Sequence, residues 1–272
     1  MRALVLGLAL AVAAASAAQA REAAWSKAAQ PTVGTASAIG SPAAGCLAGG
    51  VPLAPEGDGY QVLRPSRHRF FGHPRLVAFV RSLADAARAD GLGTVLVGDM
   101  AQPRGGPMPF GHGSHQTGLD VDIWFRIPAH PLASAEIEAP EPVSMVKGLG
   151  VDPKAWTRSQ ARLLELAARS PEVDRIFVNP SIKHHLCAST RGDRSWLAKL
   201  RPWWGHDEHF HVRLSCSVGD PNCEAQKPVP DGDGCGAELE SWFPKANVPI
   251  PSNKPHHQAR LLPSACAGVL GR

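Results

Sequence analysis

Apolar residues recur at helical spacing in two long segments of the chain. In residues 74–90 they form one stripe with intervals of three and four residues, a proline lies in the first turn and Gly91 follows the end. Residues 157–169 show the same spacing, and Thr157 with Gln160 forms a capping box at the start. Both segments are predicted to be helices with one apolar face.

Shorter apolar runs bounded by turn residues predict strands, at residues 59–63, 94–97, 175–178 and 209–214. Short helical segments are expected at 180–187 and 193–200, and a long loop between 126 and 154. Helix, strand and loop alternate without the regular spacing of a doubly wound fold. The predicted fold is therefore α+β, a compact single domain around a central antiparallel sheet with flanking helices and long loops.

The two ends of the chain differ from this pattern. Residues 1–20 have Arg2, a short apolar core and the small residues Ala18-Gln19-Ala20, which together predict a secretory signal peptide that is cleaved after Ala20. An uncleaved anchor is the alternative, but the core is too short to span a bilayer, and no other run is long and apolar enough to do so. The main domain is assigned to residues 21–245, and a proline-rich tail tethered by Cys266 to residues 246–272.

The first part of the mature chain, residues 21–52, is rich in Ala, Gly, Ser and Pro and is predicted to be an extended arm or loop. An even number of cysteines after a signal peptide predicts three disulfides formed in an oxidising compartment. Only the Cys216–Cys223 pair is suggested by the residues between its members, which form a turn. Zinc binding by cysteines is the weaker alternative because the chain has no C-x-x-C pair. The six are Cys46, Cys187, Cys216, Cys223, Cys235 and Cys266.

The charge balance narrows the choice of partner. The net charge is +4 and the sequence pI is about 8.8, a mild excess that favours an anionic partner such as a cell-wall polymer. No block of Lys and Arg with interleaved aromatic residues is present, so nucleic acid is not expected as a partner.

Candidate chemistry is concentrated in residues 111–125, which read G-H-G-S-H-Q-T-G-L-D-V-D-I-W-F. Side chains on a strand alternate between faces, so Asp120 and Asp122 are expected to point the same way and Val121 the other way. A glycine-rich loop places His115 just before this strand. Imidazole and carboxylate are suitable ligands for a borderline metal such as zinc.

A second cluster lies in residues 203–214, W-W-G-H-D-E-H-F-H-V-R-L. On a strand, His209 and His211 would face one side and Phe210 the other, while His206 precedes them after a glycine. A single histidine near an apolar run is usually structural. Two clusters at ligand spacing, each beside a strand, favour a metal site instead.

These motifs resemble a known group of enzymes. His115 and Asp122 fit H-x6-D, and His209 and His211 fit H-x-H, which mark the metallopeptidase group of lysostaphin, the D-Ala-D-Ala metallopeptidases and the sonic hedgehog signalling domain. A closer resemblance is to the penicillin-insensitive murein endopeptidases and covers nearly the whole mature chain. It is carried by G-D-M-x-Q-P-R-G-G, S-H-Q-T-G-L-D-V-D, R-I-F-V-N-P, R-P-W-W-x-H and G-D-G-C-G-A-E-L.

The resemblance implies that zinc is bound by His115, Asp122 and His211, and that His209 and His206 are catalytic. Spacing alone does not separate His209 from His211. In relatives, the position of His112 contributes to an accessory metal. The chain has no histidine between residues 130 and 184, so a second site drawing on a histidine there is not expected.

The resemblance also implies a substrate, a compartment and a set of disulfides. Members of the family cut the D-alanyl to meso-diaminopimelyl cross-link of peptidoglycan without a serine nucleophile, which explains why penicillin does not stop them. With the signal peptide, this places the protein in the periplasm. The implied disulfides are Cys46–Cys266, Cys187–Cys235 and Cys216–Cys223.

The expected mechanism uses a zinc ion with three protein ligands and a water whose pKa falls to roughly 7. His209 and His206 are assigned as base and oxyanion stabiliser, because Glu208 would face the opposite side of the strand. Asp120 has two interpretations: it accepts a hydrogen bond from a ligand histidine, or it caps the loop.

The sequence is compatible with three functions. The first is zinc-dependent cleavage of peptidoglycan cross-links. The second is a carboxypeptidase that removes terminal D-alanine. The third is a non-catalytic, metal-stabilised module that binds the cell wall, against which the presence of both His206 and His209 argues.

Overall fold

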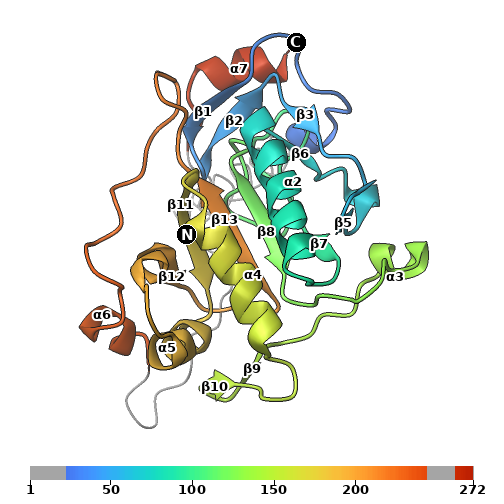
Figure 1. Ribbon diagram of the computed structural model, residues 1–272. Helices are drawn as coiled ribbons and strands as arrows, with labels where there is room; N and C mark the ends of the chain where they lie inside the picture. The colour runs from blue at the N-terminus through green and yellow to red at the C-terminus, as the bar shows by residue number, and fades with distance from the viewer. Residues whose placement is uncertain (1–22, 244–260, 272) are drawn as a thin grey trace, which may run out of the picture.

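The computed structural model describes residues 23–243 and 261–271, and it has the predicted α+β fold (Figure 1). The predicted signal peptide and most of the predicted tail lie outside the described residues. A seven-stranded sheet forms the centre, with the strand order β12-β11-β13-β8-β7-β5-β4. Its strands are β4 (Glu56–Gly57), β5 (Tyr60–Val62), β7 (Val95–Val97), β8 (Asp120–Trp124), β11 (Val173–Val178), β12 (Leu200–Pro202) and β13 (His209–Leu214).

The middle of this sheet is antiparallel, as predicted. Strands β11, β13, β8 and β7 pair antiparallel, whereas β5 pairs with β7 and β12 pairs with β11 in parallel. Every residue of β8 is buried, because both faces of the sheet are covered at this strand. The centre of the sheet is therefore a rigid support for side chains on β8 and β13.

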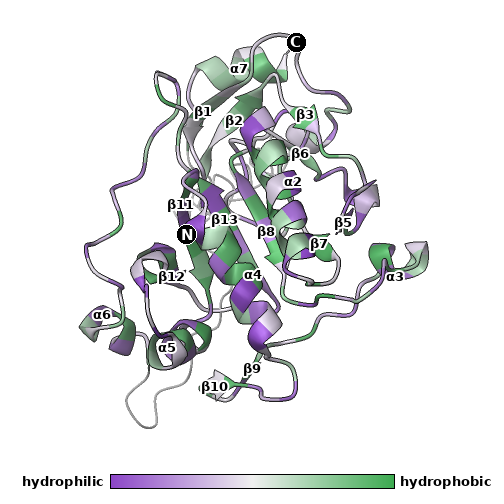
Figure 2. Ribbon diagram, viewed as in Figure 1, coloured by the Kyte–Doolittle hydropathy of each residue, from purple (hydrophilic) through white to green (hydrophobic). Residues whose placement is uncertain are grey.

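Two helices cover one face of the sheet, α2 (Pro74–Ala89) and α4 (Arg158–Arg169), and both confirm the sequence prediction. Their apolar residues join the main core, and polar residues occupy the rest of their surfaces (Figure 2). Thr157 and Gln160 form the predicted capping box, in which the backbone N–H of Ser159 donates to the Thr157 hydroxyl at 3.1 Å.

The prediction of an extended arm for residues 21–52 was wrong. This segment contains the antiparallel hairpin β1 (Ser37–Ser41) and β2 (Ala44–Ala48), and β3 (Val51–Pro52), which pairs with β6 (Phe71–Gly72). The strands consist mostly of Ala, Gly and Ser, so they lack the β-branched and aromatic residues that mark a strand in sequence.

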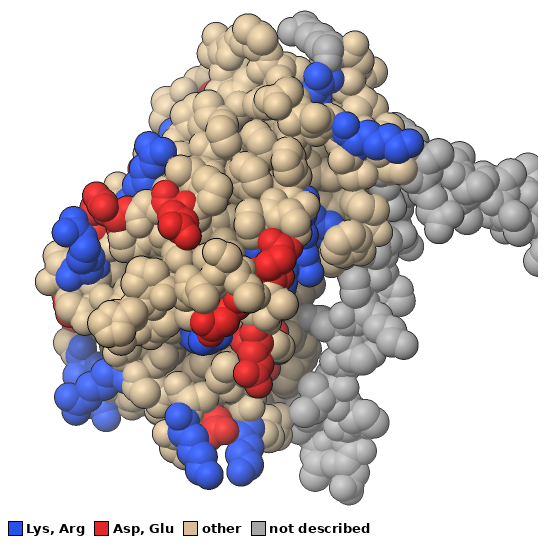
Figure 3. Space-filling model, turned by 90° about the vertical axis from the view of Figure 1, so that its right-hand side faces the viewer, with Lys and Arg blue, Asp and Glu red and all other residues tan. Residues whose placement is uncertain are grey.

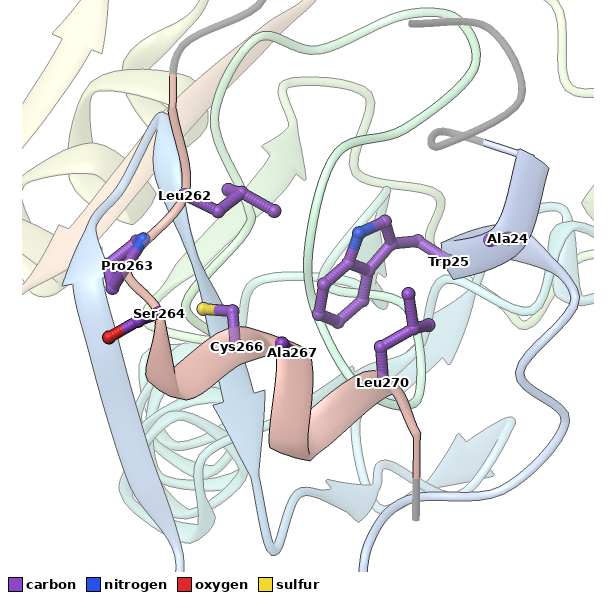
Figure 4. A pocket seen from close by; sticks show the side chains of 8 residues that line it. All are labelled: Ala24, Trp25, Leu262, Pro263, Ser264, Cys266, Ala267 and Leu270. Atoms are coloured by element: carbon purple, nitrogen blue, oxygen red, sulfur yellow. The ribbon is translucent and has the colours of Figure 1, made fainter. Parts of the chain in front are cut away.

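The hairpin is held to the end of the chain by the Cys46–Cys266 disulfide, which places α7 (Ala265–Leu270) against β2. Trp25, Leu262 and Leu270 line a small apolar pocket beside α7 (Figure 4). Cys187–Cys235 and Cys216–Cys223 are also present, so all three disulfides implied by the resemblance are confirmed.

The remaining elements lie around the sheet. The long loop predicted for residues 126–154 contains only short elements, α3 (Ser134–Glu138), β9 (Val146–Lys147) and β10 (Gly150–Val151). The others are η1 (Pro65–Arg67), α5 (Pro180–Ser189), η2 (Ser195–Lys199) and α6 (Ala237–Glu240). Acidic and basic side chains are interspersed on the face shown in Figure 3, in keeping with the small net charge. None of the helices in residues 23–243 and 261–271 is long and apolar enough to cross a membrane.

Candidate metal centre

The site is built on two neighbouring strands. In the register of β8 and β13, His211 lies directly opposite Asp122 and Arg213 opposite Asp120. The alternation predicted from the sequence is confirmed, since Val121 and Phe210 are in the main core instead. Four polar side chains of the site are thereby placed by backbone pairing.

The third element of the site is the loop between β7 and β8, which brings in His115. This residue is fully buried and has a left-handed backbone with φ of 65°. Its neighbour Gln116 ties the loop to the β1–β2 hairpin. The Nε2 of its side-chain amide donates to the carbonyl of Ala43 at 3.1 Å, and its Oε1 accepts from the N–H of Gly45 at 3.1 Å. The hairpin missed in the sequence thus supports the loop that carries His115.

Nitrogen atoms from three histidines surround one oxygen of Asp122. Asp122 Oδ1 lies 3.4 Å from His115 Nε2, 3.3 Å from His211 Nδ1 and 3.8 Å from His209 Nε2. The rings of His115 and His211 are 4.5 Å apart between centroids. The structure thus brings His115 and Asp122 of the first sequence cluster together with His209 and His211 of the second.

The buried polar atoms at this point are unsatisfied. Among the described residues, both ring nitrogens of His115 and Asp122 Oδ1 have no hydrogen-bond partner. Buried polar atoms are normally hydrogen-bonded, and leaving several unpaired in one place is unfavourable. A cation ligated by these nitrogen and oxygen atoms would satisfy them, so the residues fit a metal ion.

Asp120 orients His211 from behind. Its Oδ1 accepts hydrogen bonds from His211 Nε2 at 2.7 Å and from Arg213 Nε at 2.6 Å. The donation fixes the tautomer of His211 with Nδ1 free to face Asp122. Of the two interpretations of Asp120, the hydrogen bond to a histidine is confirmed.

Replacing Asp120 by asparagine is expected to weaken metal binding about 10- to 100-fold, because His211 loses a charged acceptor that raises its basicity and fixes its orientation. The measurement is metal affinity by competition with a chromogenic chelator. Unchanged affinity in Asp120→Asn would contradict this role.

His112 lies on the other side of Asp122. Its Nε2 is 3.3 Å from Asp122 Oδ2 and 3.3 Å from Asp99 Oδ2. Together, His112, His115 and Asp122 offer ligand atoms that all lie within 4.8 Å of one another. Asp99 is buried and forms an ion pair with Arg69 at 2.7 Å. Although burial by itself raises the pKa of Asp99, His112 and Arg69 lower it to about 2.

His206 and His209 lie next to each other at the edge of the cluster, with ring centroids 5.1 Å apart. His206 has a left-handed backbone with φ of 48°. Asn179 holds its loop: the side-chain Nδ2 donates to the carbonyl of Gly205 and the backbone N–H to that of His206, both at 3.0 Å. Residues in such backbone conformations are common at active sites.

Burial keeps three of the histidines neutral. It lowers the pKa of His115 to about 4 and that of His206 to about 3, and it also lowers the pKa of His209. Burial alone would raise the pKa of Asp122, but His112, His115 and His209 hold it well below its usual value. For His115, His206 and His209, the neutral imidazole is the form that metal ligation and proton acceptance require. Burial by itself lowers the pKa of His211, but Asp120 and Asp122 raise it, so ligation by His211 would displace a proton.

Sequence reasoning missed several supporting residues. Gln116 and Asn179 stand in two of the motifs that carry the resemblance, but the contacts by which they support the site are with other segments of the chain and are not evident from the sequence. Arg104, in the loop before the site, donates to the carbonyls of Gln30, Val269 and Leu270 and is therefore a structural residue of that loop.

A buried cluster of histidine and aspartate with unsatisfied ligand atoms, on two adjacent strands and the loop before one of them, is the arrangement expected of a metal-dependent hydrolase. Residues 38–271 match the family model described as penicillin-insensitive murein endopeptidase, and the chain belongs to this family. It is accordingly an enzyme, a peptidase.

Curated relatives agree with this assignment. The chain is 46% identical over 249 residues to a penicillin-insensitive murein endopeptidase of Yersinia enterocolitica. It is 44% identical over 252 residues to one of Klebsiella pneumoniae and 46% identical over 250 residues to one of Salmonella paratyphi B. In each case 90% of both chains is covered.

Proposed function

We propose that this protein is a zinc-dependent endopeptidase that hydrolyses the D-alanyl to meso-diaminopimelyl cross-link of peptidoglycan and is insensitive to penicillin. The observation that carries the proposal is the convergence of His115, His211 and Asp122 on a point where buried ligand atoms lack partners. Family membership supplies the substrate class.

The proposed zinc ligands are His115 through Nε2, His211 through Nδ1 and Asp122 through a carboxylate oxygen. Both nitrogens approach the same oxygen, Asp122 Oδ1. When bound, zinc supplies a polarising charge for the scissile carbonyl and lowers the pKa of a water molecule. His112 is kept as a further candidate metal residue beside this set: its Nε2 is 3.3 Å from the other oxygen, Asp122 Oδ2, and its ligand atom lies within 4.8 Å of those of His115 and Asp122.

His209 is proposed as the group that accepts the proton of the attacking water. It is adjacent to the cluster through its Nε2, and its lowered pKa keeps the imidazole neutral and able to accept a proton. His206, next to it, is proposed to donate a hydrogen bond to the oxyanion that forms on the substrate. For this role the neutral ring must carry its proton on Nε2, although its Nδ1 lies 3.3 Å from the carbonyl of Trp204.

Secretion and domain boundaries complete the proposal. A signal peptide over residues 1–20 would direct the protein to the periplasm, where disulfides form and peptidoglycan is present. The three disulfides of the described chain are consistent with that compartment. The proposed boundaries are 21–245 for the enzyme domain and 246–272 for the tail.

The test compares two substrates in the presence of penicillin. Purified mature protein is incubated with a cross-linked muropeptide dimer and, separately, with a monomeric pentapeptide. The proposal predicts that the dimer is converted to monomers while the pentapeptide keeps its terminal D-alanine. Loss of D-alanine from the pentapeptide with an intact dimer would favour a carboxypeptidase, and no cleavage of either would favour a binding module.

A further inference from the structure

A strained turn lies beside the metal centre. Four non-glycine residues among those described have positive φ, and two of them are His115 and His206 of the site. The other two, Arg64 with φ of 53° and His68 with φ of 55°, flank the 3-10 turn η1. Strain of this kind is concentrated at active sites and ligand clamps, so the η1 turn is a candidate to contact a ligand.

The turn contacts the site through Asp99. Arg67 Nη1 in the turn is 3.5 Å from Asp99 Oδ2, the same oxygen that His112 Nε2 approaches at 3.3 Å. The turn is also fastened on its other side, where the N–H and hydroxyl of Ser66 donate to the Glu138 carboxylate on α3. The guanidinium of Arg67 is therefore held at the edge of the cluster.

Arg67 and the nearby Arg69 differ in what they bind. Arg69 has a side chain that is 4% exposed, it pairs with Asp99 at 2.7 Å, and its Nη2 donates to the carbonyl of Phe110 at 3.0 Å. Arg69 thus neutralises Asp99 and fixes the loop that leads to His112. The carboxylate of Asp99 does not need a second strong cation.

Arg67 is the more open of the two. Its side chain is 33% exposed and its contact with Asp99 is longer. Both guanidinium groups lie over the ring of Phe110, that of Arg69 at 4.2 Å and that of Arg67 at 5.6 Å. Phe110 is itself 55% exposed, although it is a large apolar residue. A guanidinium has five N–H donors in a planar fork that matches a carboxylate, and the ion pair with Asp99 is the only polar contact of the Arg67 side chain with the described part of the protein.

From these contacts we infer that Arg67 binds a carboxylate of the peptide substrate and so determines which cross-link is accepted. The inference rests on the proposed function. In the proposed cross-link, the acylated amino group of the diaminopimelyl residue is on a carbon atom that also carries a free carboxylate. An anionic group is therefore next to the scissile amide, and Arg67 lies beside the metal centre in a position to bind it. Phe110 forms the apolar wall of this subsite.

The test uses two cross-linked dimers that differ only at that carboxylate, one free and one amidated. For the unaltered enzyme, kcat/KM is expected to be about tenfold or more higher with the free carboxylate. Arg67→Ala should lose that factor with the free substrate, mainly through KM, and should no longer distinguish the two. Arg67→Lys should restore part of the preference because it keeps the charge without the fork.

Arg81→Ala is the matched control, since it removes an exposed arginine of α2 and should keep the preference. If Arg67→Ala slows both dimers equally, or if the unaltered enzyme cleaves both equally well, the inference is overturned while the proposed function stands. If the unaltered enzyme cleaves neither dimer, the proposed function fails and the inference fails with it.

Discussion

Replacing His115 by alanine is expected to abolish both metal binding and peptide hydrolysis. His115 is fully buried, and neither of its ring nitrogens has a hydrogen-bond partner among the described residues, so the imidazole has no evident role there other than ligation. With only two of three ligands left, a tetrahedral zinc site is incomplete. The measurement is zinc per protein after dialysis, together with turnover of a cross-linked muropeptide dimer.

A matched control separates this effect from the general effect of losing a histidine. His184 is an exposed histidine whose side chain is 53% accessible, so His184→Ala should retain full zinc content and activity. Circular dichroism of both variants shows whether the fold persists. One equivalent of zinc and normal turnover in His115→Ala would contradict the ligand assignment.

The second large effect is expected for His209. Replacing it by alanine should leave zinc bound and lower kcat about 10² to 10⁴-fold, the range that general-base catalysis usually contributes. His209 Nε2 is 3.8 Å from Asp122 Oδ1, farther than the nitrogens of His115 and His211, so the ligand set survives its removal. Zinc content and kcat are measured on the same preparation.

The contrast between these two variants identifies the roles. Zinc content near one per protein with a large loss of kcat assigns His209 to proton transfer. If His209→Ala loses zinc as His115→Ala does, it is a ligand instead. Unchanged turnover would remove His209 from the mechanism.

Much of this site follows from local sequence patterns. Strand alternation predicts that Asp120 shares a face with Asp122, and that His209 shares one with His211, and the structure confirms both. The helices α2 and α4 follow from periodicity and capping residues in the same way. Each of these predictions depends on residues only a few positions apart.

The remainder depends on contacts between distant segments. Spacing does not separate His209 from His211, whereas the register of β8 and β13 sets His211 directly opposite Asp122 and supports the proposal that His211 is the ligand. The β1–β2 hairpin was missed because its short strands are mostly Ala, Gly and Ser, although Ile39 and Leu47 are buried and the Cys46–Cys266 disulfide holds it in place. The supporting role of Gln116 was missed because its partners in the hairpin, Ala43 and Gly45, lie 73 and 71 positions away in the sequence.

The most direct test of the proposed zinc peptidase is to measure metal content and hydrolysis in one sample. Mature protein is assayed with cross-linked dimer in the presence of penicillin, before chelation, after chelation and after zinc is restored. One zinc per protein, cleavage that disappears with the metal and its recovery on adding zinc are the predicted results. Cleavage that continues at full rate in protein shown to be free of metal would contradict the assignment of the His115, Asp122 and His211 site.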